Sequence, residues 1–238
     1  MSIAIAYGRA LVGVSAPPVA VETHLSNGLP AFNLVGLPET SVRESKERVR
    51  SAILNAGFEF PARRITVNLA PADLPKEGTR YDTAIALSIL AASGQLPAAA
   101  LSTLEIVAEL ALTGDLRGVR GIMPAALAAA AAGRALFVAP DNAAEAALVD
   151  GLAVYATHNL HALSLHLAGT TPLAPVARTP SPPPLADGGP DLIDVQGQHF
   201  VKRALEVAAA GGHNLLMSGP PGTGKTMLAM RLPGILPP

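Results

Sequence analysis

The residues most able to do chemistry lie near the end of the printed chain. Gly219-Pro220-Pro221-Gly222-Thr223-Gly224-Lys225-Thr226 fits the pattern G-x-x-x-x-G-K-[ST] at every position. The glycines permit backbone conformations in which successive N–H groups face a polyphosphate. Lys225 is expected to reach the β- and γ-phosphates, and Thr226 to place its hydroxyl on Mg²⁺. The sequence therefore predicts a Walker A loop, or P-loop, for ATP and Mg²⁺. The alternative interpretation is an ordinary glycine-rich turn.

Such a loop needs a strand before it and a helix after it. The apolar run Leu215, Leu216 and Met217 predicts a short buried strand, and an amphipathic helix ending near Ala210 is broken by the glycine pair that follows. Twelve residues follow Thr226. A nucleotide-binding α/β domain needs several more parallel strands to bury its first one, so we expect residues 191–238 to be the incomplete start of such a domain.

Composition excludes several classes of protein. Of 238 residues, 50% are hydrophobic and 15% charged, which is enough for a packed core. Cysteine is absent, so no disulfide or cysteine metal site can form, and the six histidines are scattered. We find no signal peptide and no run long enough to span a membrane, and therefore expect a cytoplasmic protein. A net charge of −1 means that nucleic acid would need a local basic patch or an oligomeric surface.

Before the loop, the pattern predicts a mixed α/β domain. Residues 18–25 and 31–35 read as the strands of a hairpin around Asn27-Gly28. A helix follows over 42–56, with Ser41 and Glu44 as a capping box, Gly57 as its stop and Glu44 paired with Arg48. Strands and helices then alternate. The strands are expected over 64–69, 105–112, 136–139 and 154–155, and the helices over 82–93, 124–132, 141–149 and 159–167, with Asp82 and Asp141 as caps.

A change of composition marks a boundary. Residues 169–190 contain seven prolines among Ala, Ser and Gly, which is typical of a semi-extended linker. We therefore expect a complete domain over 1–168, a proline-rich linker over 169–190, and the first part of the nucleotide-binding domain over 191–238.

Three stretches, 35–49, 67–78 and 197–217, resemble the Mg-chelatase-like AAA+ ATPases of the ComM/YifB family. They begin VGLPETSVRES, VNLAPADLPKEG and GQHFVKRALEVA. The resemblance implies a first domain similar to the Lon protease catalytic domain, with a ribosomal-protein-like mixed sheet, followed by an AAA+ motor. It also implies a hexameric ring that acts on branched DNA in recombination or transformation. It places Val195 and Gly197 near the base of the nucleotide.

The chain departs from the Lon-type pattern at the proteolytic dyad. Where the nucleophilic serine is expected, the segment Lys76-Glu77-Gly78-Thr79-Arg80 carries arginine, and the position of the lysine falls near Met123. Arginine cannot act as the nucleophile, and spacing offers Thr79 no base. The resemblance therefore predicts that the first domain is not a peptidase, and we expect no catalytic residue in this part of the protein.

Basic residues surround the strand over 64–69. We expect Arg63, Arg64, Lys76 and Arg80 to be exposed, with Arg63, Arg64 and Arg80 as candidate DNA contacts, although exposed cations commonly pair with neighbouring carboxylates. The expected function is the ATP-binding part of a motor that acts on DNA. Two alternatives stay open. One is a chelatase subunit that uses ATP to insert Mg²⁺ into a tetrapyrrole, and the other is a non-enzymatic binding or assembly module if the chain ends at 238.

Overall fold

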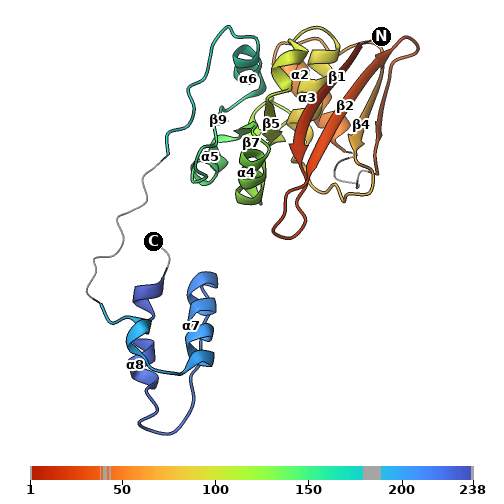
Figure 1. The fold of residues 1–238 in the computed structure, drawn as a ribbon. Helices are drawn as coiled ribbons and strands as arrows, with labels where there is room; N and C mark the ends of the chain where they lie inside the picture. Colours follow the sequence, from red (N-terminus) through yellow and green to blue (C-terminus); the bar gives the residue numbers. More distant parts are fainter. Residues whose placement is uncertain (1, 38, 40–41, 43, 179–188, 237–238) are drawn as a thin grey trace. The chain divides into compact units, whose positions relative to one another are not determined.

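The structure is a computed structural model that describes residues 2–37, 39, 42, 44–178 and 189–236 (Figure 1). The chain divides into two compact units, Met1–Thr179 and Pro180–Pro238. The division falls inside the proline-rich stretch. Each unit is described by itself below.

The first unit is built on a seven-stranded sheet in the order β3-β4-β2-β1-β5-β8-β9. The strands are β1 (Ser2–Arg9), β2 (Pro18–Ser26), β3 (Ala31–Val35), β4 (Arg64–Ala70), β5 (Leu104–Val107), β8 (Ala135–Val138) and β9 (Val154–Ala156). β2 is antiparallel to both β1 and β4, whereas the other neighbours run parallel. A separate antiparallel pair joins β6 (Glu109–Leu110) to β7 (Leu116–Arg117). The mixed α/β prediction is confirmed.

The predicted hairpin of β2 with β3 is wrong, because β4 lies between these strands. The hairpin partner of β2 is β1, which the sequence analysis did not identify. In β1 the buried alanines are Ala4 and Ala6, while Ile3 on the other side is 66% exposed. Small residues inside and a large apolar residue outside give no polar–apolar alternation, so the period of a half-buried strand is hidden. Because β1 and β4 occupy both edges of β2, β3 pairs with the far edge of β4.

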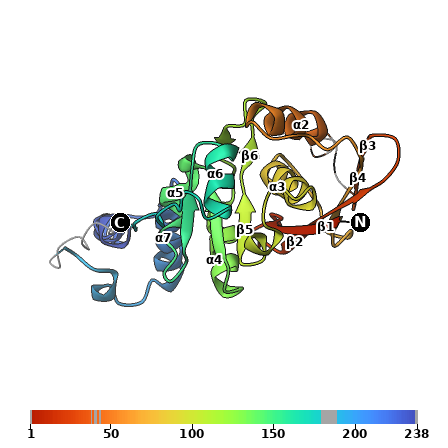
Figure 2. The same ribbon diagram turned by 90° about the horizontal axis from the view of Figure 1, so that it is seen from above.

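The helices lie on both faces of the sheet (Figure 2). One apolar cluster joins α2 (Ser45–Asn55), α3 (Asp82–Ala92), the short 3₁₀ helix η1 (Ala98–Leu101) and α6 (Leu160–Leu167), and a second joins α4 (Ile122–Ala131) and α5 (Pro140–Ala146). On β8, Phe137 belongs to the first cluster, and Leu136 and Val138 belong to the second. Because successive side chains of a strand point to opposite faces, the two clusters lie on opposite sides of the sheet.

The helix starts were predicted with mixed success. The helix predicted over 159–167 forms as α6, and Asn159 lies just before it as a cap that was not predicted, its side chain accepting a hydrogen bond from the backbone N–H of Ala162 at 2.8 Å. The caps predicted at Asp82 and Asp141 are wrong, because both residues lie inside the first turn of their helices. Asp82 is instead buried against Arg48 of α2. Ser41 of the predicted capping box lies outside the described residues.

The second unit has a small core of its own. Its elements are the 3₁₀ helix η2 (Leu192–Asp194), α7 (His199–Gly211), α8 (Lys225–Ala229) and the 3₁₀ helix η3 (Pro233–Ile235). Leu192, Val195, Leu205 and Leu228 are buried together. The strand predicted at 215–217 is wrong for this chain, since Leu216 is 92% exposed and no strand forms among residues 189–236 that could pair with it. None of the described helices is long and apolar enough to cross a membrane.

Candidate functional site

The segment 219–226 forms a loop that turns into the start of α8. Gly219, Gly222 and Gly224 have φ angles of +155°, +81° and +81°, a region that L side chains rarely adopt. Lys225 Nζ lies within the curve of the loop, donating to Gly219 O at 2.8 Å and Pro220 O at 2.7 Å. Thr223 Oγ1 also donates to Pro220 O, at 3.0 Å. The sequence therefore folds locally as a glycine-dependent turn with an ammonium group at its centre.

A pocket of about 520 Å³ adjoins this loop. Ser218, Gly219, Pro220, Thr223 and Lys225 form its polar side, and apolar residues of α7 and of the segment before the loop form the rest, including Phe200, Val201, Leu215 and Leu216. Phe200 is 87% exposed. The site thus combines one fixed cation with an apolar wall, which suits a ligand with an anionic end and a planar apolar end.

Two further predicted residues, Val195 and Gly197, lie on the segment before α7. Val195 is 2% exposed and packs with Leu228 of α8, so it anchors the helix that begins at the loop. Gly197 has a φ of +67°, and its neighbour Gln198 lines the pocket. Their approach to a nucleotide base stays a prediction.

Thr226 is exposed on the first turn of α8. A single hydroxyl would hold Mg²⁺ only together with phosphate oxygens and water, because this ion prefers six oxygen ligands. The described residues contain no group of three or more His, Cys, Asp or Glu that could hold a metal ion. The donor set therefore fits a Mg²⁺ ion that arrives with a nucleotide.

The prediction that Lys76 and Arg80 are exposed is wrong. Lys76 is 0% exposed, and its ammonium donates to the carbonyls of Pro71 and Leu74, the latter at 3.0 Å. Burial lowers the pKa of Lys76. Arg80 is 7% exposed and donates to the carbonyls of Arg9 at 3.3 Å and Arg120 at 2.5 Å. Buried backbone carbonyls require donors, and these two side chains supply them.

The resemblance aligns the Lon-type dyad with Arg80 and with a position near Met123. Arg80 is engaged with backbone carbonyls, and Met123 contributes its backbone N–H to the Glu145 carboxylate at 2.9 Å. Thr79 donates a hydrogen bond to Glu109, a partner that sequence spacing could not identify. Neither Arg80 nor Met123 can serve as the nucleophile or the base of a serine–lysine dyad.

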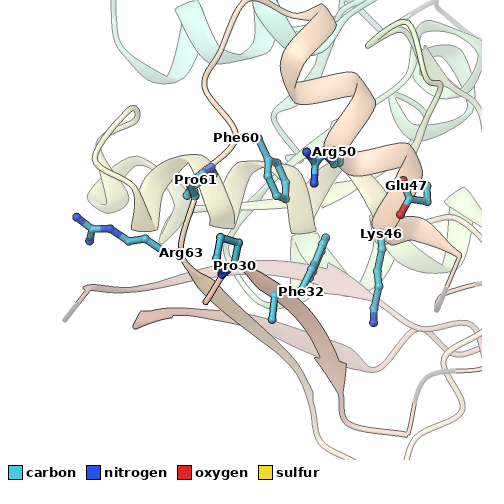
Figure 3. A pocket seen from close by; sticks show the side chains of 10 residues that line it. Pro30, Phe32, Lys46, Glu47, Arg50, Phe60, Pro61 and Arg63 are labelled. Carbon is cyan, nitrogen blue, oxygen red and sulfur yellow. The ribbon is translucent and has the colours of Figure 1, made fainter. Parts of the chain in front are cut away.

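A second hollow lies in the first unit, and sequence reasoning missed it. The Phe32–Phe60 groove, about 460 Å³, is lined by Pro30, Ala31, Phe32, Lys46, Glu47, Arg50, Phe60, Pro61, Ala62 and Arg63 (Figure 3). These residues come from β3, from α2 and from the segment that leads into β4. Only the fold brings the three segments together, so no local motif signals the groove. Of the predicted DNA contacts, Arg63 lines it and Arg64 is exposed beside it.

Comparison with known proteins gives matches over both units. A family model for subunit ChlI of Mg-chelatase matches residues 21–142, and a second, for magnesium chelatase subunit ChlI, matches residues 191–238. A Salmonella typhimurium protein named YifB is 55% identical over 239 residues, covering 100% of this chain and 47% of the relative. Competence protein ComM of Haemophilus influenzae is 55% identical over 240 residues with the same coverage, and YifB of Escherichia coli is 53% identical over 239. The chain spans about half the length of these curated relatives.

Proposed function

The chain belongs to the ComM/YifB family of Mg-chelatase-like proteins, and from that premise we propose that it carries the ATP-binding loop of a ring-forming ATPase that acts on DNA. The observation that carries the proposal is the 219–226 loop, in which Lys225 Nζ lies against the carbonyls of Gly219 and Pro220 at the start of α8. When ATP binds, the Lys225 ammonium would exchange these two neutral carbonyls for phosphate oxygens. Phosphate oxygens form stronger, charge-assisted hydrogen bonds.

Each loop residue has a distinct part in this proposal. The glycines at 219, 222 and 224 let backbone N–H groups face the phosphates, with Pro220, Pro221 and Thr223 shaping the turn between them. Lys225 binds the β- and γ-phosphates, and Thr226 holds the Mg²⁺ that accompanies them. Phe200, Leu216 and the segment around Val195 and Gly197 are proposed to contact the base. ATP, when bound, supplies the energy of phosphoryl transfer, and the catalytic residues would lie outside these 238 residues.

The first unit is proposed to serve as a binding or assembly module. The residues at the dyad position favour this role, because Arg80 is tied to backbone carbonyls and Met123 is apolar. We propose domain limits of 1–168 and 191–238 with the 169–190 linker between them. DNA as the substrate and a hexameric ring come from the family resemblance, and the competence function in the name of the Haemophilus relative supports DNA. The proposed cytoplasmic location comes from the sequence pattern, which predicts neither a signal peptide nor a membrane span.

A second candidate function is an ATPase subunit of a magnesium chelatase. The descriptions of both matching family models favour it. The experiment that separates the two measures ATP hydrolysis by the full-length protein with branched DNA, with linear duplex, and with the partner subunits of a chelatase. Stimulation by branched DNA supports the first proposal. Stimulation only by chelatase partners supports the second, and no stimulation by any of them contradicts both.

A further inference from the structure

We propose that the Phe32–Phe60 groove of the first unit binds a single-stranded nucleic acid. The rings would stack on a base, while Lys46, Arg50 and Arg63 contact backbone phosphates. This inference rests on the proposed action on DNA and deepens it by naming a surface and a strand form. It does not involve the ATP-binding loop.

The charge of the groove is the first argument. Its lining carries three cations, Lys46, Arg50 and Arg63, against the single carboxylate of Glu47, on a chain whose formal net charge is −1. Lys46 and Arg50 are four residues apart on α2 and therefore share one side of the helix. Within the described ranges, no ion pair joins any of the three cations to a carboxylate. Cations that have no carboxylate partner among the described residues and share one hollow suit a polyanion.

The aromatic rings are the second argument. The ring centroids of Phe32 and Phe60 are 6.0 Å apart with planes tilted by 44°, and the Arg50 guanidinium lies 5.3 Å from the centroid of Phe60. Both rings pack against the main apolar cluster on one side and line the groove on the other. Figure 3 shows them between Lys46 and Arg63. Rings fixed by a core offer a base a stacking surface at low entropic cost, flanked by contacts for the backbone.

The form of the ligand follows from these two arguments. A base reaches a ring face only when it is unpaired and unstacked, which favours a single strand over a duplex. Pro61, Ala62 and Arg63 also line a neighbouring cavity of about 250 Å³. The hollowed surface therefore continues past the groove, as an extended chain requires and a mononucleotide does not. An acidic peptide would contact the cations and not the ring faces. Removing the ring of Phe60 should therefore weaken the binding of a single strand but not that of an acidic peptide.

The test uses the 238-residue chain without ATP and a fluorescent oligo(dT) about 20 nucleotides long, which exceeds the usual site size of one domain. Binding is followed by anisotropy at several salt concentrations. The groove variant is Lys46→Ala/Arg50→Ala/Arg63→Ala. Its control, Arg117→Ala/Arg178→Ala/Arg203→Ala, removes the same charge from exposed arginines outside the groove. Phe60→Leu removes the ring but keeps an apolar side chain, and Phe60→Tyr restores a ring. Thermal unfolding checks the fold of every variant.

We expect the groove variant to bind about tenfold more weakly or worse, and its log–log salt slope to flatten by about 0.7 for each phosphate that the variant no longer neutralises. Phe60→Leu should weaken binding at least about fivefold without changing the slope, and Phe60→Tyr should bind like the wild type. The control triple should change affinity less than about threefold, since its charges lie elsewhere.

Four results would overturn the inference: no oligo(dT) binding by the wild type, equal losses of affinity in both triple variants, an unchanged affinity in a folded Phe60→Leu, or displacement of the probe by polyglutamate as effectively as by unlabelled oligo(dT). If Phe60→Leu does not fold, the two triple variants still decide the question. Because this assay contains no ATP, its failure is distinguishable from failure of the proposed ATPase function, which Lys225 variants test.

Discussion

Arg48 of α2 holds Asp82, the first residue of α3, through two hydrogen bonds. Nε donates to Oδ2 at 2.8 Å and Nη2 donates to Oδ1 at 3.3 Å. The Asp82 side chain is 1% exposed. Burial raises the pKa of Asp82 to about 6, and the hydrogen bond from Arg48 opposes part of that rise. Two of the helices that cover one face of the sheet, α2 and α3, are therefore joined by a carboxylate that titrates in mildly acidic solution.

The stability of the first unit should depend on this titration. The folded pKa lies above the ordinary 3.8, so the folded state binds more protons than the unfolded state from about pH 4 to about pH 6. The contribution of Asp82 to the free energy of unfolding is therefore largest below this pH range and is lost as the pH rises through it. Relative to Asp82→Asn, the free energy of unfolding of the wild type should fall by up to about 3 kcal/mol across the window. Urea titrations at a series of pH values measure it, and a rising or flat difference would refute this account.

A buried charge cluster at the centre of the sheet gives a second prediction. Glu105 is 0% exposed and accepts from Arg9 Nε at 2.5 Å, from Arg9 Nη2 at 2.7 Å and from Arg134 at 3.3 Å. Arg9→Ala leaves this carboxylate with one of its two cationic partners. We expect the free energy of unfolding to fall by about 3–5 kcal/mol, measured by urea denaturation.

The control for this variant is Arg117→Ala. Its ion pair with Glu109 spans 3.9 Å, and the Arg117 side chain is 66% exposed. Exposed pairs contribute at most about 1 kcal/mol. Equal decreases in the free energy of unfolding for the two variants would mean that burial does not determine how much the Arg9–Glu105 pair contributes to stability.

Gly36, just after β3, should tolerate no side chain. Its φ is +98°, and a Cβ there would lie 2.3 Å from the carbonyl oxygen of Leu69. Gly57 has a similar φ of +83° with nothing within 4 Å of its Cβ position, so it isolates the cost of the backbone conformation. Gly57→Ala should destabilise by about 1 kcal/mol, and Gly36→Ala by at least about 1–2 kcal/mol more. Similar melting temperatures for the two variants would disprove the steric argument.

Local patterns predicted the elements with the clearest period or punctuation. The alternation of Ile65, Val67 and Leu69 predicted β4, and the helix predicted over 159–167 forms as α6 over Leu160–Leu167. Pairing between strands was not predictable in the same way. Asn27-Gly28 is a strong turn signal, but whether β2 pairs with β3 depends on the insertion of β4, about 30 residues later in the chain.

The two candidate sites also differ in whether local sequence or tertiary structure reveals them. The 219–226 loop is a continuous motif, so its residues could be named from the sequence alone. The Phe32–Phe60 groove joins three segments that only tertiary structure brings together. The burial of Lys76 and Arg80 was also missed, because only the folded chain brings the backbone carbonyls that accept their hydrogen bonds within reach.

The 238-residue chain should bind ATP weakly. Leu215 and Leu216 are 39% and 92% exposed, so within residues 189–236 no packed sheet holds the loop that follows them. A loop whose N–H groups are not held in position must be ordered on binding, and this cost lowers affinity. Calorimetry with ATP and Mg²⁺ should give a dissociation constant weaker than about 100 μM, which corresponds to a binding free energy of about −5.5 kcal/mol. Micromolar or tighter affinity would contradict the argument.

The most direct test of the proposed function is ATP turnover by the full-length protein carrying Lys225→Ala. Arg203→Ala, on the exposed side of α7, is the control, because it removes a cation from the same unit outside the pocket lining. If Lys225 binds the β- and γ-phosphates, its loss should lower turnover at least about 10²-fold while Arg203→Ala stays near the wild type. Unchanged turnover and unchanged ATP affinity in Lys225→Ala would contradict the assignment of the 219–226 loop as the nucleotide site.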